Sequence, residues 1–387
     1  MAPGPARCAA LALLFCLLAA PAGASEQASP EPLEHGPFSS RNQFPLNWVF
    51  YSFPFRSGSI LPRGACEVEV LVSYANTFSG SDDFLAFDTG DRKRLTRGDV
   101  DDIQMENPGE SLFFMDTEQS RLSLVYRSGI GHRLEWGLEV PFITYLGGIF
   151  DSTIESYHNS LTLGNSGREF YDQDAVQMVL TWDGKTYFAD SSPSSFALGD
   201  IALTGRLALA DSPRGAAAIS LAVKFPTGDA ARLAGSGSLD AGLAAEGTLR
   251  GGKHRLHLSA SWVYIGSWDL VPSIRPGDTA AFGMAYEYVR SDRLSWIGQL
   301  QTQRSVFRGQ AQANGSLADY STELLAGARW RGVEGRWSFQ TALIENIIDQ
   351  NNGIDIGLLA GFGLRFGSGV TAPASSQAFR TAGRPLP

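Results

Sequence analysis

The sequence predicts an all-β chain that folds as a transmembrane antiparallel up-and-down β-barrel of about twelve strands. Three observations point to this fold: an export signal, strand-length segments of alternating polarity, and connections that alternate between short and long. Of 387 residues, 43 are glycine, 11% are aromatic and only 18% are charged, which favours β-structure and excludes a disordered chain. The formal net charge of −9 argues against a nucleic-acid partner, because phosphate backbones attract clustered Lys and Arg.

The first 24 residues have the features of a signal peptide. Arg7 supplies a positive n-region, Ala9–Ala20 is an apolar stretch too short for a membrane anchor, and Ala22–Ala24 is a small-residue cleavage motif. We therefore expect export and a mature chain that starts at Ser25. The next stretch, 25–62, is rich in proline and aromatic residues. We expect it to be an ordered segment that either lies in the periplasm or fills the barrel lumen.

Twelve segments of 10 to 13 residues alternate apolar and polar side chains with period 2. In 253–264, for example, Leu256 and Leu258 alternate with Arg255 and His257. Segments of this length suit tilted strands that cross the hydrocarbon layer of a membrane. The twelve segments are 66–78, 119–128, 133–145, 199–210, 215–225, 239–250, 253–264, 279–290, 293–303, 320–331, 335–345 and 355–366.

Five tight connections alternate with six longer ones along this series. Outer-membrane barrels have short periplasmic turns and longer external loops, so both ends of residues 63–366, the barrel, are expected on the periplasmic side. Aromatic residues near both ends of the segments predict two interfacial girdles. The alternative fold, a secreted β-sandwich, would leave an apolar face too large for water. The acid-free tail 367–387 is expected to be disordered.

The inward-facing positions carry charges of both signs. They predict either a salt-bridged interior that holds the barrel together or the lining of a selective polar pore. Neither sign dominates, so no preference for anions or cations follows. The candidate lumen-lining residues are Arg121, Arg133, Glu135, Glu139, Arg206, Lys224, Glu246, Arg255, His257, Glu287, Arg293, Glu323 and Arg329.

The long connection 146–198 contains the candidate constriction. Ser152–Glu155 has a capping-box pattern followed by apolar residues at helical spacing, which predicts a short amphipathic helix that plugs the lumen or lies on its rim. Val176–Phe188 predicts a hairpin that turns at Asp183-Gly184; if this hairpin joins the wall, the barrel has fourteen strands. The candidate constriction residues are Phe150, Asp151, Ile154, Glu155, Tyr157, His158 and Arg168.

No motif indicates catalysis or a resident ligand. His257 and Ser259 share one face of a strand, but no nucleophile motif, metal-ligand pattern or phosphate-binding loop accompanies them. We therefore expect no catalytic residue, no metal and no cofactor. The preferred function is passage of a small solute across the cell outer membrane. The alternatives are a lipid-modifying barrel enzyme that uses His257 or Ser259, and a structural or adhesive barrel.

Four short motifs are spread along the chain: NQFP at 42–45, GGIFD at 147–151, GDI at 199–201 and KFPTGD at 224–229. Together they resemble an uncharacterised family of Gram-negative outer-membrane barrels, a domain of unknown function. They are also similar to barrels of phenol-degradation operons, which are thought to be transporters. The resemblance implies a porin-like barrel, with outer-membrane lipid, lipopolysaccharide, the barrel-assembly machinery and a small solute as expected partners.

Overall fold

The structure is a computed structural model, and the predicted signal peptide 1–24 and residues 368–387 of the tail lie outside the residues it describes. The described residues are 34–87, 93–160, 167–308, 317–332, 335–348 and 352–367.

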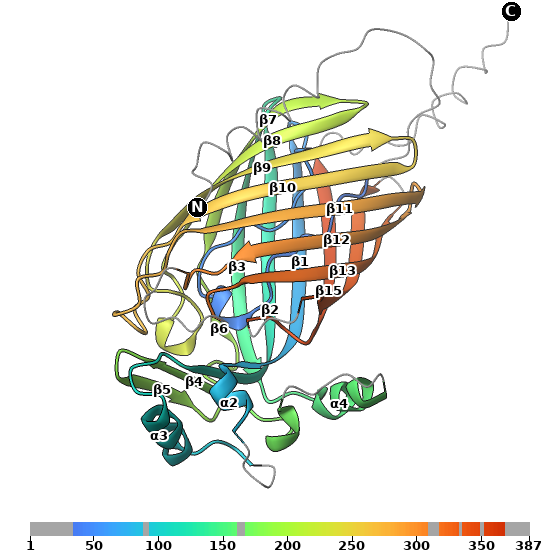
Figure 1. The fold of residues 1–387 in the computed structure, drawn as a ribbon. Helices are drawn as coiled ribbons and strands as arrows, with labels where there is room; N and C mark the ends of the chain where they lie inside the picture. Colours follow the sequence, from blue (N-terminus) through green and yellow to red (C-terminus); the bar gives the residue numbers. More distant parts are fainter. Residues whose placement is uncertain are drawn as a thin grey trace, which may run out of the picture.

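Twelve antiparallel strands close into a barrel (Figure 1). The wall strands are β1 (Ala65–Gly80), β2 (Phe113–Ile130), β3 (Leu134–Leu146), β7 (Ala202–Ser212), β8 (Gly215–Lys224), β9 (Asp240–Gly251), β10 (His254–Tyr264), β11 (Thr279–Ser291), β12 (Leu294–Arg304), β13 (Tyr320–Arg331), β14 (Trp337–Asn346) and β15 (Ile356–Gly367). Each strand pairs with the next in this series, and β15 pairs with β1, with Val72 opposite Ala360. The predicted twelve-stranded barrel is confirmed. The largest boundary difference is at β2, predicted from residue 119 and observed from Phe113.

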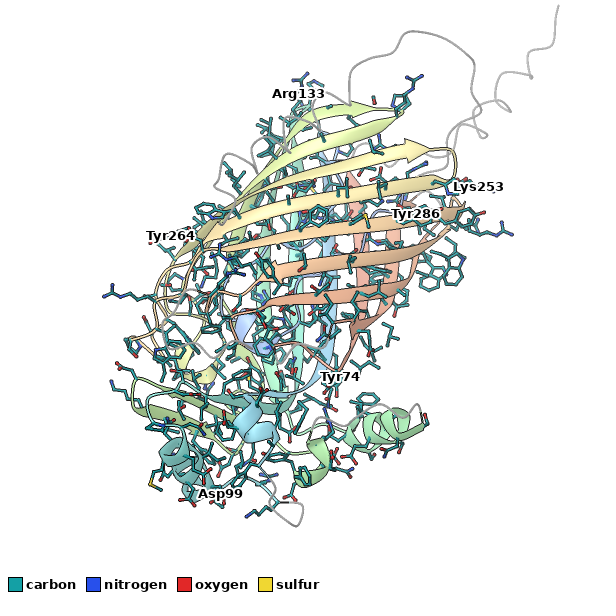
Figure 2. The ribbon with its side chains drawn as sticks, in the orientation of Figure 1. Tyr74, Asp99, Arg133, Lys253, Tyr264 and Tyr286 are labelled. Atoms are coloured by element: carbon teal, nitrogen blue, oxygen red, sulfur yellow. The ribbon has the colours of Figure 1, made fainter. Side chains whose placement is uncertain are left out.

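The period-2 pattern separates a polar interior from an apolar exterior, because successive strand side chains point to opposite faces. On β10, Arg255 and His257 are buried in the interior, whereas Trp262 faces outward. Tyr264 and Tyr286, which are 56% and 50% exposed, project outward near opposite ends of the wall (Figure 2). These positions fit aromatic residues at the two interfaces of a membrane barrel.

The predicted hairpin forms but does not join the wall. It consists of β4 (Gln177–Trp182) and β5 (Lys185–Ala189), and its turn residues Asp183 and Gly184 both have positive φ, as a two-residue hairpin turn requires. Strand β4 pairs with the start of β2, while β3 pairs directly with β7. The wall therefore has twelve strands, and the fourteen-strand alternative is wrong.

The two ends of the barrel differ. At the short-turn end, tight turns such as the one between β9 and β10 join the strands. At the other, the long-loop end, Figure 1 shows short helices beyond the strands together with β4 and β5. The remaining elements are α2 (Asp82–Leu85), α3 (Arg97–Glu106), α4 (Asp151–Ser160), β6 (Ala197–Leu198), which pairs with β3, and the 3-10 turns η2 (Arg168–Phe170) and η3 (Ala230–Arg232). Within the described ranges, no helix is long and apolar enough to cross a membrane.

Helix α4 is the predicted amphipathic helix, but it lies beyond the long-loop end and does not enter the lumen (Figure 1). Just before it, the ring of Phe150 packs edge-on against Tyr74, 5.8 Å between centroids. Tyr74 is on the outward face of β1, between the exposed Val72 and the end of the strand. The expectation that this helix constricts the lumen is therefore wrong.

The N-terminal segment occupies the lumen instead. Residues 34–62, called the plug below, contain one 3-10 turn, η1 (Pro45–Asn47), and otherwise no helix or strand. Phe55 N–H donates to Ser40 O at 2.7 Å, so the plug folds back on itself like a loop. Its side chains are mostly buried among the inward residues of the wall.

Candidate functional site

The plug is held in the lumen by polar side chains of the wall. The carboxylate of Glu287 on β11 accepts from the backbone N–H of His35 at 2.9 Å and of Gly36 at 3.1 Å. On β13, Glu323 accepts from Gln43 N–H at 2.7 Å and from the Asn42 amide at 3.1 Å. Wall carboxylates thus satisfy plug donors that have no strand partner, which buried backbone groups require.

Donors farther along the plug follow the same rule. Tyr51 N–H donates to Asp240 at 2.8 Å, and Leu61 N–H donates to Glu135 at 2.7 Å. The hydroxyl of Thr248 accepts from Gly58 N–H at 3.0 Å. Together with Glu287 and Glu323, these acceptors come from four different strands, β3, β9, β11 and β13, so the plug contacts a large part of the barrel circumference.

Wall cations bind the carbonyl groups of the plug. Arg329 donates to His35 O at 2.7 Å and to Pro37 O at 2.9 Å. Across the lumen, Arg206 donates to Ser57 O at 2.6 Å and to Ser59 O at 3.1 Å. The mixed charge of the lining therefore has a structural purpose, because carboxylates match the N–H groups and guanidiniums match the carbonyl groups of one enclosed segment.

Apolar side chains of the plug pack into spaces left by glycine on the inward faces of strands. A Cβ atom added to Gly283 would lie 2.5 Å from the ring of Phe55, and one added to Gly242 would lie 2.9 Å from the ring of Phe53. Toward the long-loop end, the ring of Phe50 packs edge-on against Trp268 at 5.8 Å. The wall is thus shaped to receive the aromatic side chains of the plug.

Ion pairs within the lining complete the arrangement. Glu139 pairs with Arg121 at 3.0 Å and with Arg41 of the plug at 2.5 Å. Lys224 pairs with Asp200 at 2.7 Å and with Asp240 at 2.9 Å. All these side chains are largely buried, so their charges are compensated by partners as burial demands.

The structure places eleven of the thirteen candidate lumen-lining residues in the interior. Arg133 and Arg293 are exposed at the short-turn end; Figure 2 shows Arg133 at the edge of the barrel. Both precede the first residue of their strand, and their carbonyl groups accept from Ala208 N–H and Arg331 N–H. Their assignment to the lumen is wrong because each residue lies in the tight turn before its strand, where side chains do not follow the inward–outward alternation.

The candidate constriction residues hold the loop to the outside of the wall. Asp151 accepts from Arg168, from the Asn76 amide at 2.9 Å and from Asp174 N–H at 2.7 Å, and Arg168 also pairs with Asp355. Glu155 accepts from Gln173 at 3.0 Å, and Ile154 is buried. The side chains of Tyr157 and His158 lie outside the described part of the chain.

The pair named for a possible enzyme is not assembled for catalysis. Nε2 of His257 is 2.9 Å from Glu287, and its Nδ1 is 2.9 Å from the Thr248 hydroxyl. Ser259 is the next inward residue along β10, and its hydroxyl forms no hydrogen bond with the imidazole of His257. His257 is fully buried beneath the plug, so it serves to orient the two side chains that hold His35 and Gly58.

Sequence reasoning listed the wall side chains but missed their partners, the backbone groups of the plug. The aromatic stretch that contains Asn42, Gln43 and Tyr51 did predict an ordered segment that could fill the lumen, but no local signal indicates which wall side chains its backbone groups contact.

Comparison with solved structures finds matches of low sequence identity. The COG4313 outer membrane channel from Pseudomonas putida F1 is 13% identical, with a TM-score of 0.48 over 79% of this chain and 97% of that one. The toluene transporter TbuX of Ralstonia pickettii is 9% identical, with a TM-score of 0.35 over 79% and 90%. A FadL homologue of Pseudomonas aeruginosa is 9% identical, with a TM-score of 0.33 over 85% and 99%.

No curated protein matches the sequence. A family model described as "Protein of unknown function (DUF3187)" matches residues 106–367. The matched residues begin at Glu106, the last residue of α3, and extend through β2 to β15. Because the match extends over more than half of the chain, the protein belongs to the DUF3187 family, and the resemblance to an uncharacterised family is confirmed.

Proposed function

We propose that this protein is an outer-membrane channel for a small solute and that the plug is its gate. The observation that carries the proposal is the way in which the plug is attached. Among the described residues, the plug has only one backbone–backbone hydrogen bond to a wall strand. In it, Ala65 N–H at the start of β1 donates to Pro62 O. Every other polar contact to the wall uses a side chain.

This attachment allows the plug to leave while the wall stays intact. Most of these contacts include a charged side chain and contribute a net of about 1.5–3 kcal/mol each, because water replaces the lost partner. The strand ladder, by contrast, is closed through β1 and β15 and does not depend on the plug. Withdrawal therefore breaks a limited set of contacts that solvent or a solute can replace.

Both ends of the plug lie at the short-turn end. Glu34 pairs with Arg250 at 2.8 Å, next to Asp211 near the end of β7, and Pro62 leads directly into β1. The plug thus enters and leaves the lumen on one side as a loop. With the short turns in the periplasm, as in outer-membrane barrels, the gate opens toward the periplasm and the long-loop end faces lipopolysaccharide.

The test is single-channel recording in planar bilayers. We expect full-length protein to show small, infrequent openings and a variant that lacks 34–62 to show a larger, lasting conductance. The matched control is Arg293→Gln, which removes a charge at the short-turn end without touching the plug.

Heat-modifiable gel mobility would show that each variant has folded into a barrel. A folded variant without the plug that conducts no more than the full-length protein would reject the gate. A second measurement, uptake of a small dye into vesicles, must change in the same direction.

A further inference from the structure

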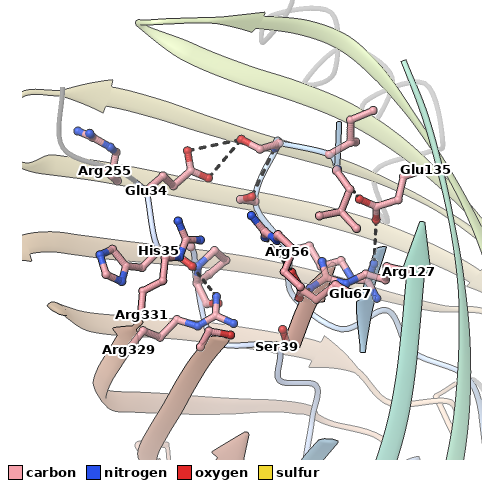
Figure 3. A pocket seen from close by; sticks show the side chains of 18 of the residues that line it. Glu34, His35, Ser39, Arg56, Glu67, Arg127, Glu135, Arg255, Arg329 and Arg331 are labelled. Carbon is pink, nitrogen blue, oxygen red and sulfur yellow. Dashed lines mark hydrogen bonds and ion pairs between the residues drawn. The ribbon is translucent and has the colours of Figure 1, made fainter. Parts of the chain in front are cut away.

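A cavity of about 560 Å³ lies between the plug and the wall at the short-turn end (Figure 3). Plug residues 34–37 and 55–62 form one side, and inward residues of the wall form the other. Its volume is within the range of sites that bind small molecules. Figure 3 shows Arg255, Arg329 and Arg331 on one side of this space and Arg56 and Arg127 on the other.

The lining of the cavity is strongly positive. Eight arginines line it but only three glutamates, Glu34, Glu67 and Glu135. The arginines are Arg56, Arg127, Arg206, Arg250, Arg255, Arg329, Arg331 and Arg365. Clustered guanidiniums in a partly enclosed space repel one another and create a positive potential.

Two of the three lining glutamates are each shared by two arginines, and Glu34 pairs with Arg250. Glu67 pairs with both Arg127 and Arg365, and Glu135 pairs with both Arg206 and Arg56. Arg331 has no ion pair in the described part of the chain. Three carboxylates behind the lining also pair with its arginines: Glu69 with Arg329, Glu246 with Arg206 and Asp211 with Arg250. Six carboxylates thus pair with the arginines of the lining, which leaves two more guanidinium groups than carboxylates.

Two guanidinium atoms here also lack a hydrogen-bond partner. The Nε–H groups of Arg127 and Arg329 are buried and donate no hydrogen bond to the described residues. Buried polar groups normally have partners, so these donors point to a ligand that supplies acceptor atoms.

The middle of the lumen does not share this imbalance. There Lys224 lies between two aspartates, and Arg121 and Arg41 share Glu139. The surplus of cations is thus a local property of the short-turn end and does not follow from the overall charge, which is negative.

The same cavity has an apolar part. Phe55, Ile60 and Leu61 line it beside the arginines. Guanidinium groups bind carboxylates and phosphates by paired, charge-assisted hydrogen bonds, and the apolar side chains add a surface for a hydrocarbon body.

We propose that this cavity binds a small organic oxyanion, a carboxylate or phosphate with an apolar body. The inference deepens the proposed function by naming the class of solute, and its transport aspect rests on that function. Binding itself is a property of the closed, plugged protein and is tested without any flux measurement.

The experiment is titration calorimetry on full-length protein in detergent, with benzoate and benzamide as probes. These molecules have nearly the same shape and differ in charge. We expect benzoate to bind at least about tenfold more tightly than benzamide, since charged hydrogen bonds are the stronger ones. Inorganic phosphate is expected to bind more weakly than benzoate, because it leaves the apolar side chains uncovered.

Variants test whether benzoate binds in this cavity. Arg331→Gln is expected to weaken benzoate binding about tenfold, Arg331→Lys to retain most of it, and Arg293→Gln, at the same end but outside the cavity, to leave it unchanged. Equal binding of benzoate and benzamide would overturn the proposal. So would unchanged benzoate binding by a folded Arg331→Gln variant. Either result leaves the gate untouched, since the gate is judged by conductance alone.

Discussion

Glu287 on β11 accepts a hydrogen bond from the backbone N–H of His35 at 2.9 Å, which joins the barrel wall to the first described part of the plug. The same carboxylate accepts from the Ser295 hydroxyl at 2.6 Å and lies 2.9 Å from Nε2 of His257. Side chains of the two neighbouring strands, His257 on β10 and Ser295 on β12, therefore orient the Glu287 carboxylate independently of the plug. Such preorganisation means that the lining is built for this segment and is not a generic polar surface.

Removal of Glu323 is expected to open the channel. In Glu323→Ala, Gln43 N–H and the Asn42 amide lose their acceptor, and each unsatisfied buried donor costs about 1–3 kcal/mol. The open probability in single-channel recordings should rise at least about tenfold. Glu323→Gln keeps one acceptor oxygen and should have a smaller effect. An open probability equal to that of Arg293→Gln would contradict this role.

A side chain at Gly283 is expected to displace the plug. In Gly283→Val, the new Cβ would lie 2.5 Å from the ring of Phe55, which is a clash within a packed interior. Limited proteolysis should cut residues 34–62 faster, and conductance should rise. The control is Gly298→Val on β12, where nothing lies within 4 Å of the new Cβ.

Combination with Phe55→Ala removes the clash and should restore slow proteolysis in Gly283→Val. Fast cleavage in the double variant would mean that the substitution damages the wall and does not act through the plug.

Loss of Arg168 is expected to loosen α4 without opening the channel. Its guanidinium pairs with Asp151 and Asp355, and removal of one partner from a buried ion pair costs about 3–5 kcal/mol. Hydrogen exchange of α4 should therefore accelerate in Arg168→Gln. The control is Arg94→Gln, whose exposed pair with Asp172 at 4.0 Å contributes about 0–1 kcal/mol. A conductance change in Arg168→Gln would mean that the long connection that contains α4, and not the plug, gates the channel.

A charge on the outer face is expected to destabilise the barrel. Met284 on β11 is 42% exposed and lies opposite Leu258 and Leu300, in the middle of the apolar face. Met284→Arg should lower the free energy of unfolding in lipid vesicles by about 2–4 kcal/mol. Met105→Arg, on α3 with 70% of its side chain exposed, should change it little. Equal stability of the two variants would place Met284 outside the hydrocarbon layer.

The wall strands could be predicted because their signal is local. On β10, Arg255 and His257 alternate with Leu256 and Leu258. This alternation is enough to predict which side chains face the barrel interior and which face lipid. The exceptions are at strand ends. Arg133 and Arg293 continue the alternation in the sequence, but a tight turn sets their direction, and a turn does not follow the period of the strand.

The hairpin and helix of the long connection could be predicted as elements but not in position. The Asp183-Gly184 turn is a local property, whereas the pairing of Phe113 with Leu180 depends on contacts across the chain. The amphipathic pattern of a helix predicts that one face is buried, but it does not predict which surface that face contacts. For α4 that surface is set by Glu118, which accepts from Ile149 and Phe150 N–H at 3.0 and 2.9 Å.

The sequence by itself determined the all-β class, the twelve wall strands as segments and the polar interior, because period-2 alternation and turn length are properties of neighbouring residues. The tertiary structure decided that the β4–β5 hairpin stays out of the wall, because its pairing with β2 depends on distant contacts. Only the tertiary structure decided what occupies that interior. The plug has no period of its own, and its partners are far away in the chain: Gln43 and Glu323 are 280 residues apart. Contacts of that kind arise when the wall closes and brings distant side chains around one segment, and the arginine-lined cavity beside the plug arises in the same way.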